Sequence, residues 1–334
     1  MRNFLMPAEM LHAIWVWRKT WRTFPILAWI QGAKFYKEGK FDKAAKLYEK
    51  GITRHPTHPA RYAAQLDLAF CYFRSMEFVK AEVLLQELIL DNPNLLEAHI
   101  LLVRLYLWTG RPVNASSHIS LHIRNFSHSA ELTTLYLMAC IESETNGDLL
   151  QEAISFFSKS HSINQVTAGS TLDLLSKTAN AMLQYYLGEE TESIKTLNQI
   201  VGSSCPPVEA LLRLAYIYLK QCRYEETLSL LHRALRASPS NPNILLALSR
   251  CYLRLRTKDS VLYAVQLATS ACQASNWLNN QALWMLTEAY IETGNFIDAA
   301  LVARKALNDG TDFFKNKRTG IIKSWSTDSS RLDH

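Results

Sequence analysis

Long hydrophobic runs are missing from this sequence of 334 residues. No stretch of about 18 consecutive apolar residues occurs, so we expect no helix that crosses a membrane. A secretory signal is missing too, because Glu9 and His12 interrupt the only candidate apolar region near the N-terminus. The six cysteines are scattered without a CxxC pair, which predicts buried free thiols in a reducing compartment. We therefore expect a cytoplasmic protein and leave association with a membrane surface open.

Motifs of common enzyme families are missing as well. The sequence contains no dinucleotide-binding GxGxxG, no phosphate-binding P-loop, no HExxH zinc motif and no GxSxG nucleophile turn. His118 and His122 share one predicted helix face at a spacing that can bind zinc, but no third ligand is apparent. A structural role for these two histidines is favoured. We accordingly predict a non-enzymatic protein with no catalytic residue, no cofactor and no metal site.

An excess of charge is also missing from the body of the chain. Residues 25–303 carry 25 cations and 25 anions, although the net charge of the whole chain is +6. The excess lies at the ends, since residues 1–24 carry four cations and one anion, and residues 304–334 carry seven and four. A balanced body argues against a groove for nucleic acid, so no nucleic-acid partner is expected. The basic ends leave contact with an anionic surface open.

A pattern that recurs along the chain is the main feature that is present. Each copy begins with a small residue and an aromatic residue, which precede a turn. After the turn come, in order, an aromatic residue, a small residue, a large apolar residue and a second small residue. Four copies are nearly complete, and they cover residues 32–56, 68–93, 214–239 and 286–310. In the first copy Gly32 and Phe35 precede Gly39, whose freedom to take positive φ suits the end of a helix. Pro56 then stops the second helix.

This pattern resembles the tetratricopeptide repeat, a helix–turn–helix unit of about 34 residues. With four weaker copies, we count eight repeats over roughly residues 25–310. The resemblance implies an all-α fold, a right-handed superhelical α-solenoid of stacked repeats. We expect an N-terminal capping or docking helix (1–24), repeats one to four (25–163), a loop or joint (164–173), repeats five to eight (174–312) and a basic to polar tail (313–334).

The resemblance also implies a binding surface, because in this family the first helix of each repeat lines the concave face. Reading the helical phase predicts an inner wall rich in aromatic and cationic side chains, which are the usual hot spots of protein interfaces. The predicted residues are Trp29, Tyr36, Lys37, Phe70, Phe73, Arg74, Arg104, Trp108, Tyr185, Tyr186, Tyr216, Lys220, Arg250, Arg254 and Trp284, with Glu288 and Glu292 beside the last of them. Packing between repeats is the alternative for several of these side chains.

Such a wall suits an extended or helical peptide that carries some acidic residues. We therefore interpret the chain as a protein–protein interaction scaffold or adaptor that binds a peptide segment or assembles a complex. Two alternatives stay open. One is a chaperone for a secreted or membrane-bound client, and the other is a regulatory subunit of a membrane-associated assembly or glycan-synthesis machine.

The segment before the first repeat combines tryptophan with cations. Its residues Trp15, Trp17, Arg18, Lys19, Trp21 and Arg22 fall on a predicted helix over residues 8–23. A terminal repeat needs its open apolar face covered, so a cap is the first interpretation. The same composition suits docking on a protein or lying on an anionic membrane, and both remain alternatives.

Overall fold

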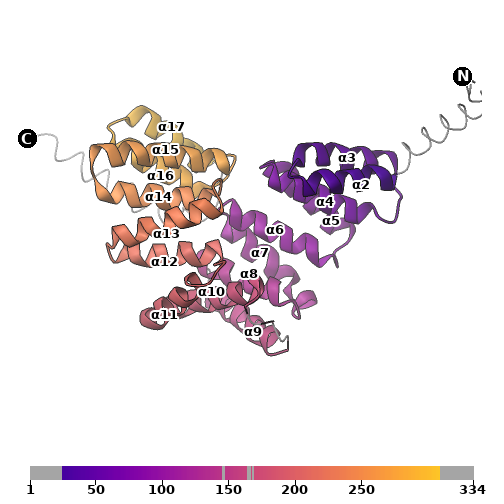
Figure 1. Cartoon of the computed structure of the whole chain (residues 1–334), viewed down its shortest axis with the longest axis horizontal. Coiled ribbons are helices and arrows are strands. Elements are labelled where there is room, and N and C mark those ends of the chain that lie inside the picture. Colours follow the sequence, from indigo (N-terminus) through magenta and orange to yellow (C-terminus); the bar gives the residue numbers. More distant parts are fainter. Residues whose placement is uncertain (1–24, 145–146, 164–166, 168, 309–334) are drawn as a thin grey trace, which may run out of the picture. The chain divides into compact units, whose positions relative to one another are not determined.

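A computed structural model describes residues 25–144, 147–163, 167 and 169–308, all of whose regular elements are helical. The chain divides into two compact units, Met1–Leu105 and Tyr106–His334 (Figure 1). The predicted docking helix and C-terminal tail lie outside the described residues. No described helix is long and apolar enough to cross a membrane.

The first unit is a stack of helical hairpins. Consecutive helices pack against each other, from α2 through α5. The helices are α2 (Pro25–Lys37), α3 (Phe41–Arg54), α4 (Arg61–Arg74), α5 (Phe78–Asp91) and α6 (Leu96–Trp108), the last of which continues into the second unit. Ala44, Ala69 and Ala81 are fully buried between helices, which is why the repeat pattern demands small residues there.

The second unit continues the same arrangement. It comprises α7 (Pro112–His122), η1 (Ile123–Phe126), α8 (Ala130–Glu142), α9 (Gly147–Ile163), α10 (Thr171–Tyr186), α11 (Glu190–Val201), α12 (Val208–Lys220), α13 (Tyr224–Ala237), α14 (Pro242–Leu255), α15 (Lys258–Ala274), α16 (Asn280–Glu292) and α17 (Phe296–Asn308). Each first helix of a repeat packs on its own partner and on the first helix of the next repeat, as α8 does on α9 and α10. The helices α8, α10, α12, α14 and α16 therefore form an inner layer, and we call their shared exposed side the inner wall.

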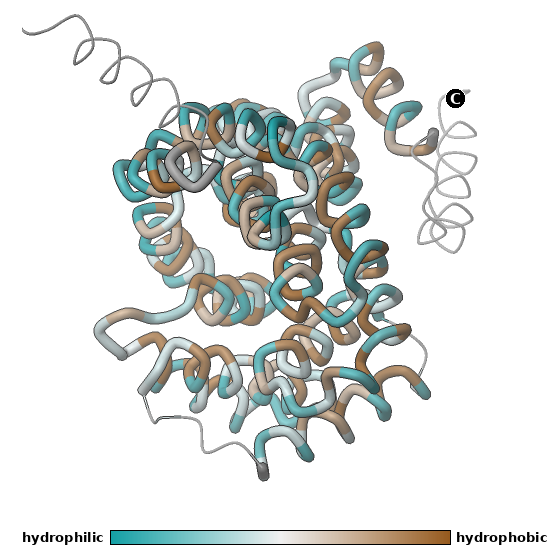
Figure 2. Tube along the Cα trace, turned by 90° about the vertical axis from the view of Figure 1, so that its right-hand side faces the viewer, coloured by the Kyte–Doolittle hydropathy of each residue, from teal (hydrophilic) through white to brown (hydrophobic). Residues whose placement is uncertain are grey.

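Apolar and polar residues alternate along the helices, so that each helix has an apolar side (Figure 2). From α10 to α17 these sides build one continuous core, with Leu214, Ile217, Leu248 and Leu283 essentially inaccessible to solvent. Burying one such side chain contributes roughly 2 kcal/mol, so the stack is held mainly by these apolar contacts between neighbouring helices. The predicted all-α solenoid of eight stacked hairpins is confirmed for the described residues.

The connection within the seventh repeat is short, because α14 and α15 are separated only by Arg256 and Thr257. The residues that follow lie in α15, which spans 17 residues and has Thr257 as its N-terminal cap. The Thr257 side chain accepts a hydrogen bond from the Ser260 amide. This cap stabilises the first turn of α15, so the helix can begin directly after Thr257.

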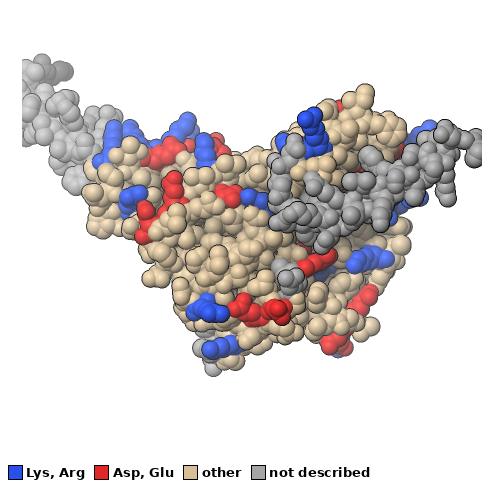
Figure 3. Space-filling view, turned by 180° about the vertical axis from the view of Figure 1, so that it is seen from behind, with Lys and Arg blue, Asp and Glu red and all other residues tan. Residues whose placement is uncertain are grey.

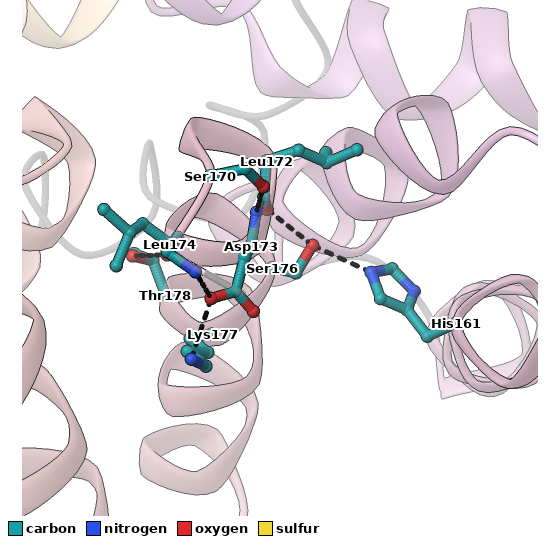
Figure 4. Close-up of polar contacts among 9 residues, drawn as sticks. His161, Ser170, Leu172, Asp173, Leu174, Ser176, Lys177 and Thr178 are labelled. Carbon is teal, nitrogen blue, oxygen red and sulfur yellow. Dashed lines mark hydrogen bonds and ion pairs between the residues drawn. The ribbon is translucent and has the colours of Figure 1, made fainter. Parts of the chain in front are cut away.

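The stretch predicted as a joint, residues 164–173, lies partly outside the described residues. On either side of it, polar side chains link neighbouring helices, and Figure 4 shows the contact between His161 and Ser176. His161 Nε2 of α9 lies 2.8 Å from Ser176 Oγ of α10, and Ser176 Oγ lies 3.3 Å from Thr134 Oγ1 of α8. Ser170 caps α10, because its hydroxyl oxygen accepts a hydrogen bond from the Asp173 amide. The Asp173 carboxylate forms an ion pair with Lys177. Within the second unit α10 therefore packs directly on α8, and the two compact units divide elsewhere.

Candidate protein-interaction surface

Every first helix of a repeat ends in the same way. Two residues after its last helical residue, or one residue after it in α14, a residue adopts positive φ and redirects the chain into the second helix. In four repeats this residue is glycine, and in the other four it is not: Gly39, Met76, Gly110, Glu144, Gly188, Cys222, Arg256 and Gly294, with φ between 49° and 91°. This shared conformation sets a common register for all eight repeats.

The register picks out a row of side chains at equivalent places. Counting two residues back from each positive-φ residue gives what we call the terminal row: Lys37, Arg74, Trp108, Glu142, Tyr186, Lys220, Arg254 and Glu292. All of these side chains are exposed except Trp108, which is half-buried. Because the positions repeat once per hairpin, the row follows the first helices along the stack.

In the first unit the predicted binding residues form a ladder of aromatic rings. Tyr36 makes edge contacts with Phe41 and Phe70, at ring-centre distances of 5.4 and 5.6 Å. The ladder continues through Phe70 and Phe73 to Phe78. Tyr36, Phe70 and Phe73 are half-buried, and burial raises the pKa of Tyr36. These rings are thus used largely for packing between repeats, with their remaining surface open.

The cations of this unit are more accessible. Arg74 is exposed and places its guanidinium 5.1 Å from the centre of the Phe41 ring, while Lys37 and Arg104 are exposed as well. Trp29 differs from the expected exposed position. It is 8% exposed, with its ring against Gly51 and an edge contact of 5.2 Å to His58. Glycine at position 51 leaves the room that this large ring needs between α2 and α3.

In the second unit a lysine lies over two aromatic rings. Lys220 Nζ is 4.7 Å from the centre of the Tyr216 ring and 5.6 Å from that of Tyr185. The Tyr216 hydroxyl raises the pKa of Lys220, so the ammonium stays charged at neutral pH. Arg213 contacts the same Tyr216 ring from another side, at 5.7 Å. Cation–π contacts of this kind hold flexible cationic side chains in place while leaving their outer faces open.

Two further arginines of the inner wall have acidic neighbours. Arg213 Nη2 lies 3.4 Å from Glu142 Oε1, across the inner layer from α12 to α8. Loss of hydration around its carboxyl group raises the pKa of Glu142 although 38% of the side chain is exposed, and Arg213 opposes that shift. Arg250 is half-buried near Tyr216 and Glu288, and burial lowers the pKa of its guanidinium. These contacts link inner helices electrostatically, since Arg213 joins α12 to α8, two repeats away, and Arg250 of α14 lies near groups on α12 and α16.

The remaining predicted residues lie on or beside the same surface. Tyr186 is 48% exposed, and Arg254 is exposed one repeat beyond Lys220. Trp284 is half-buried against the apolar core, so only part of its ring is available. Arg213 and Glu142 were not among the predicted residues. Glu142 lies two residues before the positive-φ residue of its repeat, but that residue is Glu144 and not glycine, so the sequence alone does not reveal the turn.

The described residues give little indication of catalysis. Ser176 and His161 are within hydrogen-bonding distance, yet Ser176 is buried and the other ring nitrogen of His161 contacts the Phe157 carbonyl at 2.9 Å. A serine nucleophile would need access and an orienting carboxylate, so this pair joins helices instead. His118 and His122 stack on α7 with ring centres 5.0 Å apart. The predicted docking residues Trp15, Trp17, Arg18, Lys19, Trp21 and Arg22 lie outside the described residues.

Comparison with known proteins agrees with this geometry. Models of the tetratricopeptide repeat match residues 35–97 and 208–251, which cover parts of both units. The chain therefore contains tetratricopeptide repeats. No curated protein sequence matches the chain.

Solved structures of tetratricopeptide-repeat type share the fold at low sequence identity. One is a tetratricopeptide repeat protein from Parabacteroides merdae, at 13% identity and a TM-score of 0.52, covering 78% of this chain and 98% of that one. Another is a human IFIT1 dimer with m7Gppp-AAAA, at 14% identity and a TM-score of 0.51, covering 84% of this chain and 67% of that one. Identities this low establish similarity of fold and carry no information about the ligand.

Proposed function

We propose that this protein is a non-enzymatic interaction scaffold that holds a segment of a partner protein on the inner wall of its second unit. The observation that supports this most is the cluster of Tyr185, Tyr216 and Lys220 with Arg250 and Arg254. Cation–π contacts join Lys220 of α12 to Tyr216 and to Tyr185 of α10, and Arg250 of α14 interacts electrostatically with Tyr216. Aromatic rings and cations held in fixed positions supply contact area at little entropic cost, as binding hot spots do.

A protein segment fits this wall better than a nucleic acid does. The five inner helices of the second unit carry six carboxylates and five cations, and three of those cations, Lys177, Arg213 and Arg250, have an acidic neighbour. Binding to a phosphate backbone depends on many cations that are free to replace counterions. Charges of both signs are also interspersed on the face shown in Figure 3. The ligand of the IFIT1 structure, m7Gppp-AAAA, is therefore not proposed as a ligand of this chain.

The test compares two double variants of the full-length protein. Tyr186→Ala with Lys220→Ala removes exposed side chains from the inner wall, and Leu262→Ala with Lys258→Ala removes exposed side chains from the outer helix α15. Because all four residues are exposed, we expect both variants to keep their melting temperature within about 2 °C. Partner proteins recovered by affinity purification from native cells should be lost with the inner variant and kept with the outer one. Equal recovery by both variants would place the binding surface elsewhere.

A further inference from the structure

The inner wall of the second unit contains cations of two kinds. Arg213 and Lys177 form ion pairs with Glu142 and Asp173, and the half-buried Arg250 is stabilised by the charge of Glu288. Among the described residues no carboxylate forms an ion pair with Lys220 or Arg254. Both are exposed, and Lys220 lies against the rings of Tyr185 and Tyr216. The uncompensated positive charge of this wall is therefore concentrated at two residues.

Lys220 and Arg254 occupy equivalent places in successive repeats. Each lies two residues before the positive-φ residue of its repeat, which is Cys222 in one case and Arg256 in the other. Equivalent positions on adjacent inner helices face the same way, because successive repeats stack with a regular geometry. The two cations thus present one continuous positive segment that spans two neighbouring repeats.

The same row reverses its charge on both sides of this segment. In order along the chain, the terminal row of the second unit reads Trp108, Glu142, Tyr186, Lys220, Arg254 and Glu292. Within this row Glu292 is the position after Arg254. On the other side, Tyr186 is the only position between Glu142 and Lys220. An acidic ligand that extends beyond the two cations would therefore meet Glu292 on one side and, on the other side, Glu142, whose charge Arg213 partly offsets.

From this charge order we propose, resting on the function proposed above, that the partner segment carries a short acidic cluster whose carboxylates pair with Lys220 and Arg254. Residues beside the cluster are neutral or basic, because Glu142 and Glu292 lie opposite them. An aromatic or aliphatic side chain on one side of the cluster contacts Tyr186. The flanking carboxylates restrict the binding register, since shifting the cluster by one repeat would place like charges together.

This specificity differs from simple attraction to acidic chains. A long polyanion would gain no more ion pairs than a short cluster, because only two cations are uncompensated, and it would be repelled at both ends. Paired exposed charges contribute modestly in each case. The preference for a short cluster should therefore be a graded difference in affinity, and it should weaken as salt screens the charges.

Synthetic peptides can measure this preference with the full-length protein. Each peptide has a tyrosine beside a central run of no glutamate, about two or three glutamates, or about eight glutamates, with serine or lysine at the flanks. We expect fluorescence anisotropy to show the short run binding about tenfold more tightly than the peptide without glutamate, and more tightly than the long run. Lysine flanks should bind more tightly than serine flanks.

Charge variants connect the preference to the named residues. Lys220→Glu with Arg254→Glu should weaken the short-run peptide by about tenfold or more, and Glu292→Gln should selectively improve binding of the long run. The matched control is Lys195→Glu with Arg304→Glu, which reverses one lysine and one arginine that are exposed on the outer helices α11 and α17. The control should bind the short-run peptide as the wild type does. Melting temperatures should agree among all variants, since each changed residue is exposed.

Three results would overturn the inference. They are equal affinity for peptides with and without the short run, unchanged affinity in the Lys220→Glu and Arg254→Glu variant, and a long run that binds at least as tightly as the short one. If any of these occurs while Tyr186→Ala with Lys220→Ala still loses the cellular partner, the scaffold function stands and only the acidic cluster is wrong. If that alanine variant keeps the partner, the inner wall itself is not the site.

Discussion

At the scale of single residues, the end of each inner helix combines one backbone conformation with very different side chains. Gly39, Gly110, Gly188 and Gly294 take positive φ without steric cost, whereas Met76, Glu144, Cys222 and Arg256 do so against their preference. A side chain in the left-handed region costs roughly 1 kcal/mol or more relative to glycine. The packing of the following helix imposes the conformation, because the hairpin must close at the same place in every repeat.

Replacing Cys222 by glycine should therefore stabilise the protein. Cys222 has φ of 60° and is exposed, so its side chain makes little compensating packing. The relief of backbone strain exceeds the extra entropy of the unfolded chain, which leaves a net gain of about 0.5–1 kcal/mol. Chemical denaturation should show a higher midpoint with an unchanged slope.

The matched control is Gln221→Gly at the neighbouring position. Gln221 has φ of −81°, where glycine brings flexibility without relief of strain. We expect this variant to be less stable than the wild type. If both variants changed stability in the same direction, backbone strain at Cys222 would not be the cause.

The cysteines provide a second test at this scale. Cys71, Cys140, Cys251 and Cys272 are buried, and Cys205 and Cys222 are exposed. Burial raises the pKa of Cys71 and Cys272 to about 12 and that of Cys251 to about 11, so the reactive thiolate is disfavoured as well as inaccessible.

A thiol reagent at about pH 8 should accordingly modify two cysteines quickly in the native protein, and all six only after unfolding. Cys222→Ser should reduce the fast phase to one thiol. Rapid modification of more than two would contradict the burial of the other four. The sequence predicted buried free thiols in general, and it could not show that two of them lie in turns or loops that leave them exposed.

At the scale of helices, one turn in the second unit contacts helices far along the chain. Asn243 Nδ2 at the start of α14 donates a hydrogen bond of 3.1 Å to the Leu107 carbonyl. Asn279 is the buried N-terminal cap of α16, and its amide lies 3.4 Å from Asn243 Oδ1. A Cβ atom at Gly110 would lie only 2.2 Å from Asn279 Nδ2. The turn after α6 thus fits against the first turns of two inner helices.

Gly110→Ala should disturb this contact and lower stability. Alanine strains the backbone at φ of 68° and also forces the Asn279 side chain away, which weakens the cap of α16. Strain costs about 1 kcal/mol and loss of a cap about another 1 kcal/mol, so we expect a total loss of about 2 kcal/mol. Hydrogen exchange should increase at the first amides of α16.

Gly188→Ala is the matched control, since Gly188 ends α10 at φ of 91° and no atom lies within 4 Å of its added Cβ. This variant should show the strain alone, with unchanged exchange at α16. Equal losses of stability in the two variants would mean that the contact with Asn279 contributes nothing.

The elements themselves could be predicted from the sequence, and this contact could not. The alternation of small and aromatic residues, with glycine or proline at the ends, marks helix pairs because those requirements are local. The contact between Leu107 and Asn243 joins residues 136 positions apart and depends on how many repeats stack with what curvature. Likewise the helical phase placed Arg250 on the inner wall, but its partial burial beside Tyr216 and Glu288 follows from neighbouring repeats.

At the scale of the whole molecule, the balance of charge distinguishes the body from the ends. The body has equal numbers of cations and anions, while the first 24 residues carry a net charge of +3 and four of the eight tryptophans lie between residues 15 and 29. A repeat stack needs its terminal apolar face covered, and residues 1–23 directly precede the first repeat in the sequence. Their proposed role as a cap can be separated from contact with lipid.

Deleting residues 1–23 should lower stability if the segment covers the first repeat. Burial contributes roughly 25 cal/mol per Å², so a cover of a few hundred Å² would provide several kcal/mol. The truncated protein should also self-associate more strongly, because the uncovered apolar face seeks another partner. Thermal denaturation and size-exclusion chromatography measure these two effects. Unchanged values for both would show that the segment is not a cap.

Charge removal within the segment separates the cap from a membrane contact. Arg18, Lys19 and Arg22 carry charged heads that need water, so replacing all three by serine should leave the cap and the melting temperature unchanged. Binding to vesicles that contain anionic lipid depends on such cations at about 1 kcal/mol each, and it should fall for this variant only if the segment lies on the membrane.

The matched control replaces Lys43, Lys46 and Lys50, three exposed lysines of α3, by serine and removes the same charge from the body. We expect both triple variants to sediment with vesicles to the same small extent as the wild type, because a cap directs its tryptophans toward the first repeat. Selective release of the Arg18, Lys19 and Arg22 variant would instead assign these residues to a lipid surface.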